Sequence, residues 1–454
     1  MQSKFFHIDS NDKQVSVLLQ LAIFFNLFYS YYFFRTPFDF YVGYIFYIVL
    51  IPRYYLKYGI PKNLLLIFSL LLFIGVYFTI TGDNELGFFL KVLLGAFFAY
   101  LLMYYIVIKE VYNSKKLFKV YLKFAFFTAL FGIIQVVVYN LGIDTGKGPF
   151  WFFGTLSLFP GGLFGFRVNV FFGEPTYYAM SMSGALFVAI HDLIYANKAF
   201  YFKRFAASVV ILGVYLSFSG TIVGSFAFIF ILLALNYGVI RYLLIASPIA
   251  LMLFIQLITT SNDLESRYDG TLSLFLDAPT KSFNVYKYHG SSVILYDHLF
   301  VAVQNFINHP LFGTGIGSHE IAYDKYSLIK NHIIYQYRPN VKDASSMFNR
   351  LLSETGLFGI GLFIFLIVSA FIKKRSTKDD KLWIISAACL VVIMINMARQ
   401  GHYFLNGFPF YVWMYYSVFK ERKNLLIEGK NNKPVFFEQN EQTMKSIEST
   451  NKSK

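Results

Sequence analysis

The sequence predicts an all-α polytopic membrane protein, and three observations lead there: composition, the length of the apolar runs, and the placement of charge. Hydrophobic residues make up 56% of the 454 residues and charged residues only 14%, whereas soluble proteins carry about 25% charged residues. Apolar stretches long enough to cross a hydrocarbon core ~30 Å thick recur along the chain. The composition excludes a disordered chain and a coiled coil, and the single Cys389 excludes a secreted disulfide scaffold.

We expect about 12 transmembrane helices, with a long polar interval between the ninth and the tenth. The uncharged run at residues 205–237 would measure roughly 50 Å as one helix, which is too long for one crossing. We therefore divide it at Ser217–Thr221, where Ser and Gly residues suit a tight turn. The expected spans are residues 15–34, 38–51, 63–80, 88–108, 118–141, 176–193, 205–218, 220–237, 242–260, 356–372, 382–397 and 403–419.

The distribution of Lys and Arg predicts that both chain ends face the cytoplasm, because cytoplasmic segments of membrane proteins are rich in these residues. With the N-terminus inside, the inner segments contain the clusters Lys109–Lys123 and Lys373–Lys381 and the basic residues from Lys420 onward. The formal net charge of +15 then reflects topology, and we expect no nucleic-acid partner. We expect one integral membrane domain over residues 1–419 and a polar cytoplasmic tail over residues 420–454.

Two of the expected outside segments are long, residues 142–175 and 261–355, and we expect them to form the functional site. Long segments between the elements of a compact protein are usually functional or disordered. The second segment has apolar residues at helical spacing within Leu295–His309, followed by Pro310. We expect an amphipathic helix there, on or near the outer membrane face, so the large extracytoplasmic loop is partly helical.

Arg167 and Glu174 define the first candidate motif, which leads through Pro175 into the sixth span. Charged groups at a membrane boundary are costly unless they are paired, solvated or functional. A structural interpretation makes Glu174 a helix cap, because a carboxylate favours the positive N-terminal end of a helix, and makes Arg167 a snorkelling side chain. A functional interpretation has Arg167 bind an anion and Glu174 act as a base or an orienting group.

The Gly-rich stretch His309–Gly317 is the second candidate motif. Gly-rich loops can cradle phosphates through their backbone N–H groups. A dinucleotide fingerprint requires a strand before the loop and a helix after it, whereas here a predicted helix comes first. We therefore reject nucleotide binding by this stretch.

The segment Arg338–Gly361 contains the third candidate motif. Arg350 and Glu354 are spaced i, i+4, so on a helix they share a face and can simply pair. Arg binds phosphate through a planar and permanently charged fork, and several converging Arg side chains suit a pyrophosphate. The eight His residues include no H-x-x-x-H pair, so we expect no metal site. The candidate guanidiniums on the outside segments are Arg167, Arg267, Arg338, Arg350 and Arg399.

Residues 166–372 together resemble the bacterial O-antigen polymerase and O-antigen ligase superfamily of polytopic glycosyltransferases. The similar features are Arg167 followed by Glu174-Pro175, the Ser-Gly turn between two spans, the His-Pro-Leu-x-Gly-x-Gly stretch in a large outside loop, and Glu354 with Gly356 and Gly359 at the next span. Ligases of the family carry a His-Asn pair upstream of these glycines. The matching positions here are Ser345 and Ser346, so the resemblance favours a polymerase over a ligase.

The resemblance implies a metal-independent enzyme without a cofactor, at the outer face of a bacterial plasma membrane. It would transfer a growing glycan from undecaprenyl diphosphate to another lipid-linked repeat unit, with membrane lipid and a chain-length regulator protein as further partners. The five candidate guanidiniums would bind the diphosphate, and Glu174 or, second, Glu354 would act as base, which makes Arg167, Glu174, Arg350 and Glu354 the expected catalytic residues. An O-antigen ligase and a polysaccharide or lipid transporter (a flippase) remain alternatives. The sugars, the linkage and the final product, whether O-antigen, capsule or exopolysaccharide, stay open.

Overall fold

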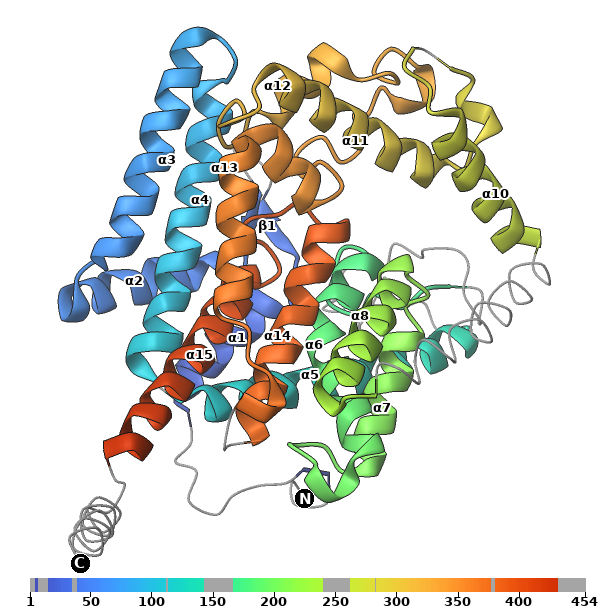
Figure 1. Ribbon diagram of the computed structural model, residues 1–454. Helices are drawn as coiled ribbons and strands as arrows, with labels where there is room; N and C mark the ends of the chain where they lie inside the picture. The colour runs from blue at the N-terminus through green and yellow to red at the C-terminus, as the bar shows by residue number, and fades with distance from the viewer. Residues whose placement is uncertain are drawn as a thin grey trace, which may run out of the picture.

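The computed structural model describes residues 5–6, 15–34, 39–111, 113–142, 166–239, 262–281, 283–376 and 380–431, without the side chains of residues 262–268, 380 and 428–431. Within these ranges the chain is almost entirely helical (Figure 1). The main helices are α1 (Val17–Leu27), α2 (Tyr44–Tyr58), α3 (Lys62–Thr81), α4 (Leu86–Tyr104), α5 (Ser114–Asn140), α6 (Pro175–Ile194), α7 (Arg204–Tyr215), α8 (Gly220–Tyr237), α10 (Asn262–Asp277), α11 (Gly290–Asn308), α12 (His319–Tyr326), α13 (Met347–Ser369), α14 (Asp380–Arg399) and α15 (Phe408–Asn431).

Six helices in the described part of the chain are long and apolar enough to cross a membrane: α3, α4 with the π-helical turn Tyr105–Glu110, α5, α8, α13 and α14. Helix α3, at the edge of the bundle in Figure 1, buries only Leu64 and Gly75. Leu66, Phe73 and Ile80 on its surface are 71–81% exposed. A continuous apolar face of this kind is unfavourable in water and favourable against lipid. The fold is therefore that of an all-helical protein suited to a bilayer.

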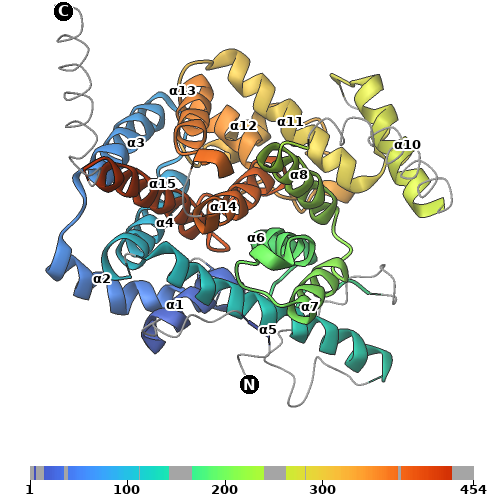
Figure 2. The same cartoon turned by 60° about the horizontal axis from the view of Figure 1, so that its bottom comes forward.

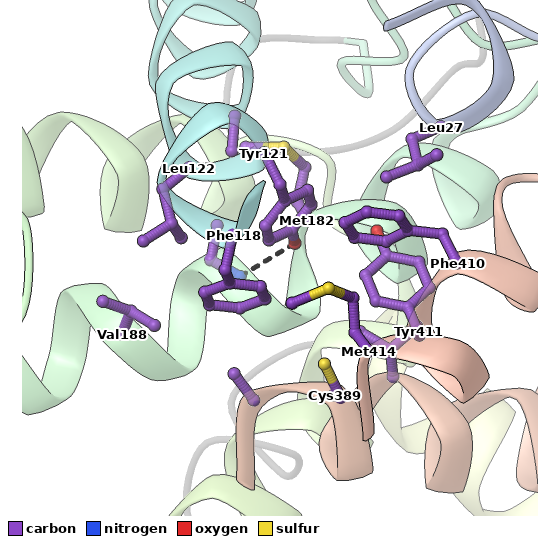
Figure 3. Packing of buried hydrophobic residues seen from close by; sticks show 14 of the residues in the cluster. Leu27, Phe118, Tyr121, Leu122, Met182, Val188, Cys389, Phe410, Tyr411 and Met414 are labelled. Atoms are coloured by element: carbon purple, nitrogen blue, oxygen red, sulfur yellow. Dashed lines mark hydrogen bonds between the residues drawn. The ribbon is translucent and has the colours of Figure 1, made fainter. Parts of the chain in front are cut away.

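Helix α14 lies in the middle of the bundle, with α6, α8, α13 and α15 packed around it (Figures 1 and 2). Figure 3 shows the core around Cys389 of α14, where side chains of α5, α6 and α15 meet. Tyr121 of α5 and Tyr411 of α15 each donate a hydrogen bond to the carbonyl oxygen of Ser181, at 2.8 and 3.0 Å. The N–H of Ala185 in turn donates to the Tyr121 hydroxyl at 3.0 Å. These bonds fix α6 against its neighbours and so fix the position of its first turn.

Helices α10, α11 and α12 form a layer across one end of the bundle, whereas the start of α7 and the end of α15 lie toward the opposite end (Figure 1). The predicted helix at Leu295–His309 is part of α11, which ends at Asn308. Asp297, His298 and Asn305 on its inner face are buried, while Ile307 on its outer face is 63% exposed. Several polar side chains of α11 therefore lie inside the protein, whereas part of its apolar face is exposed.

Several boundaries differ from the expected spans. The first apolar run is only partly helical, because Tyr32–Phe34 (β1) pairs as an antiparallel strand with Phe40–Tyr41 (β2). The run at residues 205–237 is indeed divided, since α7 ends at Tyr215 and α8 begins at Gly220. Helix α15 does not end at residue 419 but continues to Asn431. The expected span at 242–260 lies outside the described residues.

A break in α13 at Gly356 explains both Gly-rich motifs. Gly356 has φ 58° and ψ −151°, so the N–H groups of Leu357 and Phe358 no longer point at the preceding turn of α13. They donate instead to the carbonyls of Pro310 and Leu311, at 2.9 and 3.0 Å.

The carbonyls of Ser353 and Glu354, which α13 leaves without their helical donors, accept from Thr314 and Gly315 at 3.3 and 2.8 Å. The segment His309–Gly317 thus exchanges backbone hydrogen bonds with the broken helix. A Cβ on Gly356 would lie 2.6 Å from the carbonyl oxygen of Pro310. The glycines allow close backbone packing, and buried backbone groups at the break stay satisfied.

Candidate functional site

Arg167 and Glu174 lie in the segment before α6, and buried hydrogen bonds attach this segment to α5. Gln135 of α5 donates from Nε2 to Oδ1 of Asn169 and accepts the N–H of Val170, both at 3.1 Å. Arg167 is half-buried and Glu174 is exposed to solvent. Glu174 occupies the cap position of α6, but its side chain makes no capping hydrogen bond. The predicted cap position is therefore confirmed, but not through a side-chain hydrogen bond.

Arg350 lies in the first part of α13, where it is buried, with 4% of its side chain exposed. Its Nε donates to Oε1 of Glu354 at 3.0 Å, so the predicted i, i+4 pair forms. Its Nη1 donates to the carbonyl of Gly401 at 2.8 Å, and its guanidinium carbon lies 4.3 Å from the centre of the Tyr403 ring. The remaining nitrogen, Nη2, has no hydrogen bond within the described residues and is not sealed from solvent. The guanidinium is thus held on three sides and open on one.

Both carboxylate oxygens of Glu354 are engaged. Oε1 accepts from Arg350 and, at 3.5 Å, from the backbone N–H of His319, and Oε2 accepts from the Tyr403 hydroxyl at 2.9 Å. The side chain is 1% exposed. A buried carboxylate that accepts from every side is suited to fix Arg350 in place rather than to take a proton from a substrate.

Asp343 lies in a backbone segment with unusual conformation, and its carboxylate contacts both this segment and His402. Its Oδ1 accepts the N–H of Ser345 at 2.9 Å, and its Oδ2 lies 3.3 Å from Nε2 of His402. Left-handed conformations cost about 1–3 kcal/mol each in residues other than Gly, and they cluster at functional sites. Four such residues occur in this short segment: Arg338 (φ 51°), Asn340 (56°), Ala344 (55°) and Ser345 (57°).

The charges of these segments lie within electrostatic range of one another. Although Glu174 is exposed in part, desolvation by the protein around its carboxyl group raises its pKa above the ordinary value. The Asp343 carboxylate raises this pKa further, while Arg399 and Arg167 oppose both effects. Arg167 and Arg399 therefore lie within electrostatic range of the same carboxylate. Asp343 connects this pair to the interior of the site, because it also acts on the titration of His402.

His402 joins the same network from the segment between α14 and α15. Burial lowers the pKa of its imidazole, the Asp343 carboxylate opposes this, and the positive charges of Arg350 and Lys342 lower it again. The Tyr177 ring of α6 lies against the imidazole, with ring centres 6.1 Å apart. His402 therefore stands where α6, the Asp343 segment and the start of α13 meet.

His298 and His319 form a buried pair beside Glu354, which accepts the backbone N–H of His319. His298 Nε2 lies 2.8 Å from the carbonyl of Pro339, and its Nδ1 lies 3.0 Å from Nε2 of His319. A carbonyl only accepts, so in the neutral pair His298 donates to Pro339 and accepts from His319. Burial lowers the pKa of both imidazoles, which keeps them neutral near pH 7. Within the part of the chain that the structure describes, the Nδ1 of His319 has no hydrogen-bond partner.

Two of the five predicted guanidiniums are not shown in this network. The Nη2 of Arg338 donates to both carboxylate oxygens of Asp324 at 2.8 Å, and its Nη1 lies 3.5 Å from Oε1 of Glu320, so two carboxylates of α12 already neutralise Arg338. Arg267 lies in α10, and its side chain is outside the described part of the structure. Of the five predicted guanidiniums, Arg167, Arg350 and Arg399 therefore remain as candidates.

Asp343, His402 and Tyr403 contribute to the site although the sequence motifs did not single them out as site residues. Tyr403 and His402 follow Arg399 by only a few positions, so the run Arg399-Gln-Gly-His-Tyr was the one available signal. Among the described residues, no group of three His, Cys, Asp or Glu side chains is placed to hold a metal ion. The chemistry of the donors present, guanidiniums with carboxylates and imidazoles, suits a phosphate-bearing ligand and proton transfer.

Neither the models of known protein families nor the curated proteins include a match to this chain.

Proposed function

We propose that the chain is a polysaccharide repeat-unit polymerase of a bacterial plasma membrane. It transfers a growing glycan from undecaprenyl diphosphate to a second lipid-linked repeat unit. The observation that carries the proposal is electrostatic: Arg167 and Arg399 lie within range of Glu174, Arg350 lies within range of Asp343, and Asp343 acts on Glu174 as well. The resemblance of residues 166–372 to polymerases and ligases of lipid-linked glycans supports the same activity.

The guanidiniums provide the electrostatic part of the proposed reaction. Cleavage of the bond between sugar and diphosphate leaves negative charge on the diphosphate, and fixed donors aimed at that charge lower the barrier. Arg350 is suited to this role because its ion pair with Glu354 and its bond to Gly401 hold it rigidly while Nη2 stays open. Loss of one such donor costs about 10²–10³-fold in rate in comparable sites.

The proposed topology has about twelve spans, with both chain ends in the cytoplasm and the layer α10–α12 outside. The layer and the end of α15 lie toward opposite ends of the bundle (Figure 1), and the Lys373–Lys381 cluster precedes α14 at the inner end expected from charge. The exposed apolar side of α11, which includes Ile307, suits contact with the outer membrane surface. Two lipid-linked substrates would then reach the site from the bilayer and react side by side.

The proposal is tested with purified protein in proteoliposomes and lipid-linked repeat units extracted from host cells that lack the chain. The wild-type protein is expected to give a ladder of products on a gel. Arg167→Ala is expected to reduce the rate of chain growth by about 10²-fold or more. The control Arg204→Ala changes an exposed Arg at the start of α7 and should keep the ladder. A wild-type protein without any ladder contradicts the proposal.

The same assay separates the two alternatives. An O-antigen ligase would give no ladder from repeat units alone but would attach them to added lipid A core. A flippase would move a labelled lipid-linked repeat unit across the proteoliposome membrane without changing its size. Ser345 and Ser346, in place of the His-Asn pair of the ligases that the chain resembles, favour the polymerase.

A further inference from the structure

His402 has the geometry of an oriented base. Its Nε2 faces Oδ2 of Asp343 at 3.3 Å, and 19% of its side chain is exposed. Its other nitrogen, Nδ1, has no hydrogen-bond partner within the described residues and is not among the atoms that the protein seals from solvent. A carboxylate next to one imidazole nitrogen favours the proton on that nitrogen, which leaves a lone pair on the other.

The protein holds this pair in place from both sides. Gly401 approaches Asp343 so closely that a Cβ at position 401 would overlap the Asp343 carbonyl oxygen. The carbonyl of Gly401 also accepts from Nη1 of Arg350 at 2.8 Å. Arg350 therefore fixes the backbone next to His402 while its Nη2 stays open. The same contacts therefore position the Arg350 guanidinium, which is proposed to bind the diphosphate, and the His402 imidazole.

The other groups that could take a proton are less well placed. Both oxygens of Glu354 already accept hydrogen bonds. Burial and the Asp343 carboxylate raise the pKa of Glu174, but its side chain makes no capping hydrogen bond at the start of α6 that would orient the carboxylate. His319 is 1% exposed, so a sugar hydroxyl cannot reach it. His402 alone among these combines an oriented imidazole with access.

We propose that His402, oriented by Asp343, is the base that takes the proton of the acceptor sugar hydroxyl; this rests on the proposed polymerase activity. The hydroxyl oxygen forms the new bond to the anomeric carbon of the donor glycan. The bond from that carbon to the diphosphate oxygen breaks, and its electron pair leaves with the diphosphate. The hydroxyl proton moves to Nδ1 of His402, and the imidazolium then releases it to water.

The first test measures the initial rate of ladder formation from pH 5 to pH 8.5 for the wild type, His402→Ala and His402→Gln. A base acts only when it is deprotonated, and the pKa of this imidazole is lowered, so the wild-type rate should fall on the acidic side below about pH 6.5. The charged or titratable groups that act on His402 are Asp343, Arg350 and Lys342, with the Tyr177 ring against it. Both variants should lose about 10²–10⁴-fold in kcat and the acidic fall-off.

Chemical rescue and binding separate catalysis from structure. Added imidazole should restore part of the His402→Ala rate, and binding of undecaprenyl diphosphate to both variants should stay within about twofold of wild type. The matched control is His309→Gln, because His309 is a half-buried imidazole 3.9 Å from Asp83 that lies outside the network. It should keep the rate and the acidic fall-off.

The outcomes distinguish this inference from the proposed function. A wild-type protein without a ladder overturns the polymerase and this inference with it. A wild-type ladder together with full activity in both His402 variants overturns the inference alone. The inference is also wrong if Glu174→Gln loses the decrease in rate at acidic pH while His402→Gln keeps this decrease. That result would assign the proton to Glu174.

Discussion

Arg350 is buried, and each of its nitrogen atoms has a different environment. Nε pairs with Glu354, Nη1 binds the carbonyl of Gly401, and Nη2 remains open. A buried ion pair rarely adds much net stability, but the loss of one partner leaves an uncompensated buried charge. The pair therefore keeps a positive charge in a rigid position, and this is the property that binding of a diphosphate requires.

Arg350→Ala is expected to lower the free energy of unfolding by about 3–5 kcal/mol, because it leaves the Glu354 carboxylate buried without its partner. The measurement is chemical unfolding in detergent followed by tyrosine and tryptophan fluorescence. The matched control is Arg338→Ala, which breaks a partly exposed pair with Asp324 and should cost about 0–1 kcal/mol. Equal losses in the two variants would contradict the assignment of Arg350 to the protein interior.

Some of these contacts were open to prediction from the sequence. The i, i+4 spacing of Arg350 and Glu354 predicted their pair, since the spacing depends only on local helix geometry. Two other contacts join positions that are distant in the sequence: the hydrogen bond from Arg350 to Gly401 and the contact of His402 with Asp343. No short motif predicts such contacts. Arg338 was predicted in the site, but the nearby α12 supplies Asp324 and Glu320 as partners.

At the scale of elements, the broken helix α13 determines where the site lies. Its first part contains Arg350 and Glu354, and its second part, after Gly356, contains the apolar residues that suit a membrane. The exchange of backbone hydrogen bonds with His309–Gly317 connects the break to α11. A Gly-rich stretch that suggested phosphate binding therefore has a structural role in helix packing.

Gly356→Ala is expected to destabilise the protein by about 2 kcal/mol or more, because the left-handed φ of 58° and the contact with Pro310 both oppose a Cβ. The matched control is Gly361→Ala in the same helix, where a Cβ would meet nothing within 4 Å. That change should be neutral or stabilising by roughly 0.5–1 kcal/mol. Thermal unfolding in detergent measures both; a Gly356→Ala variant as stable as Gly361→Ala would contradict the described break.

The first apolar run shows where the prediction of secondary structure from the sequence was wrong. Apolar length alone predicted a span at 15–34, but its second half is rich in Tyr and Phe, which favour strands. The strands β1 and β2 pair there, with the rings of Phe34 and Phe40 stacked 4.9 Å apart. Hydropathy measures the apolar character of a segment, and this measure does not distinguish a helix from a short aromatic hairpin.

At the scale of the whole molecule, composition predicted a helical fold because a bilayer would impose the same constraint on every long apolar run. Helices satisfy their own backbone hydrogen bonds, so long apolar runs in a membrane become helices. The positions of α6 and α13 relative to each other depend instead on how both pack against α14. The sequence singled out candidate segments, but which of their side chains make contact depends on the packing and could not be predicted from short motifs.

The central claim is that guanidiniums from separate segments together hold the diphosphate of a lipid carrier. Binding of undecaprenyl diphosphate to purified protein tests it most directly. Arg167→Gln and Arg399→Gln should each weaken binding by about tenfold or more, since a hydrogen bond to a charged group contributes about 1.5–3 kcal/mol. Arg204→Gln, at the start of α7, should leave binding unchanged. Equal affinity in all four proteins, wild type included, would contradict the account.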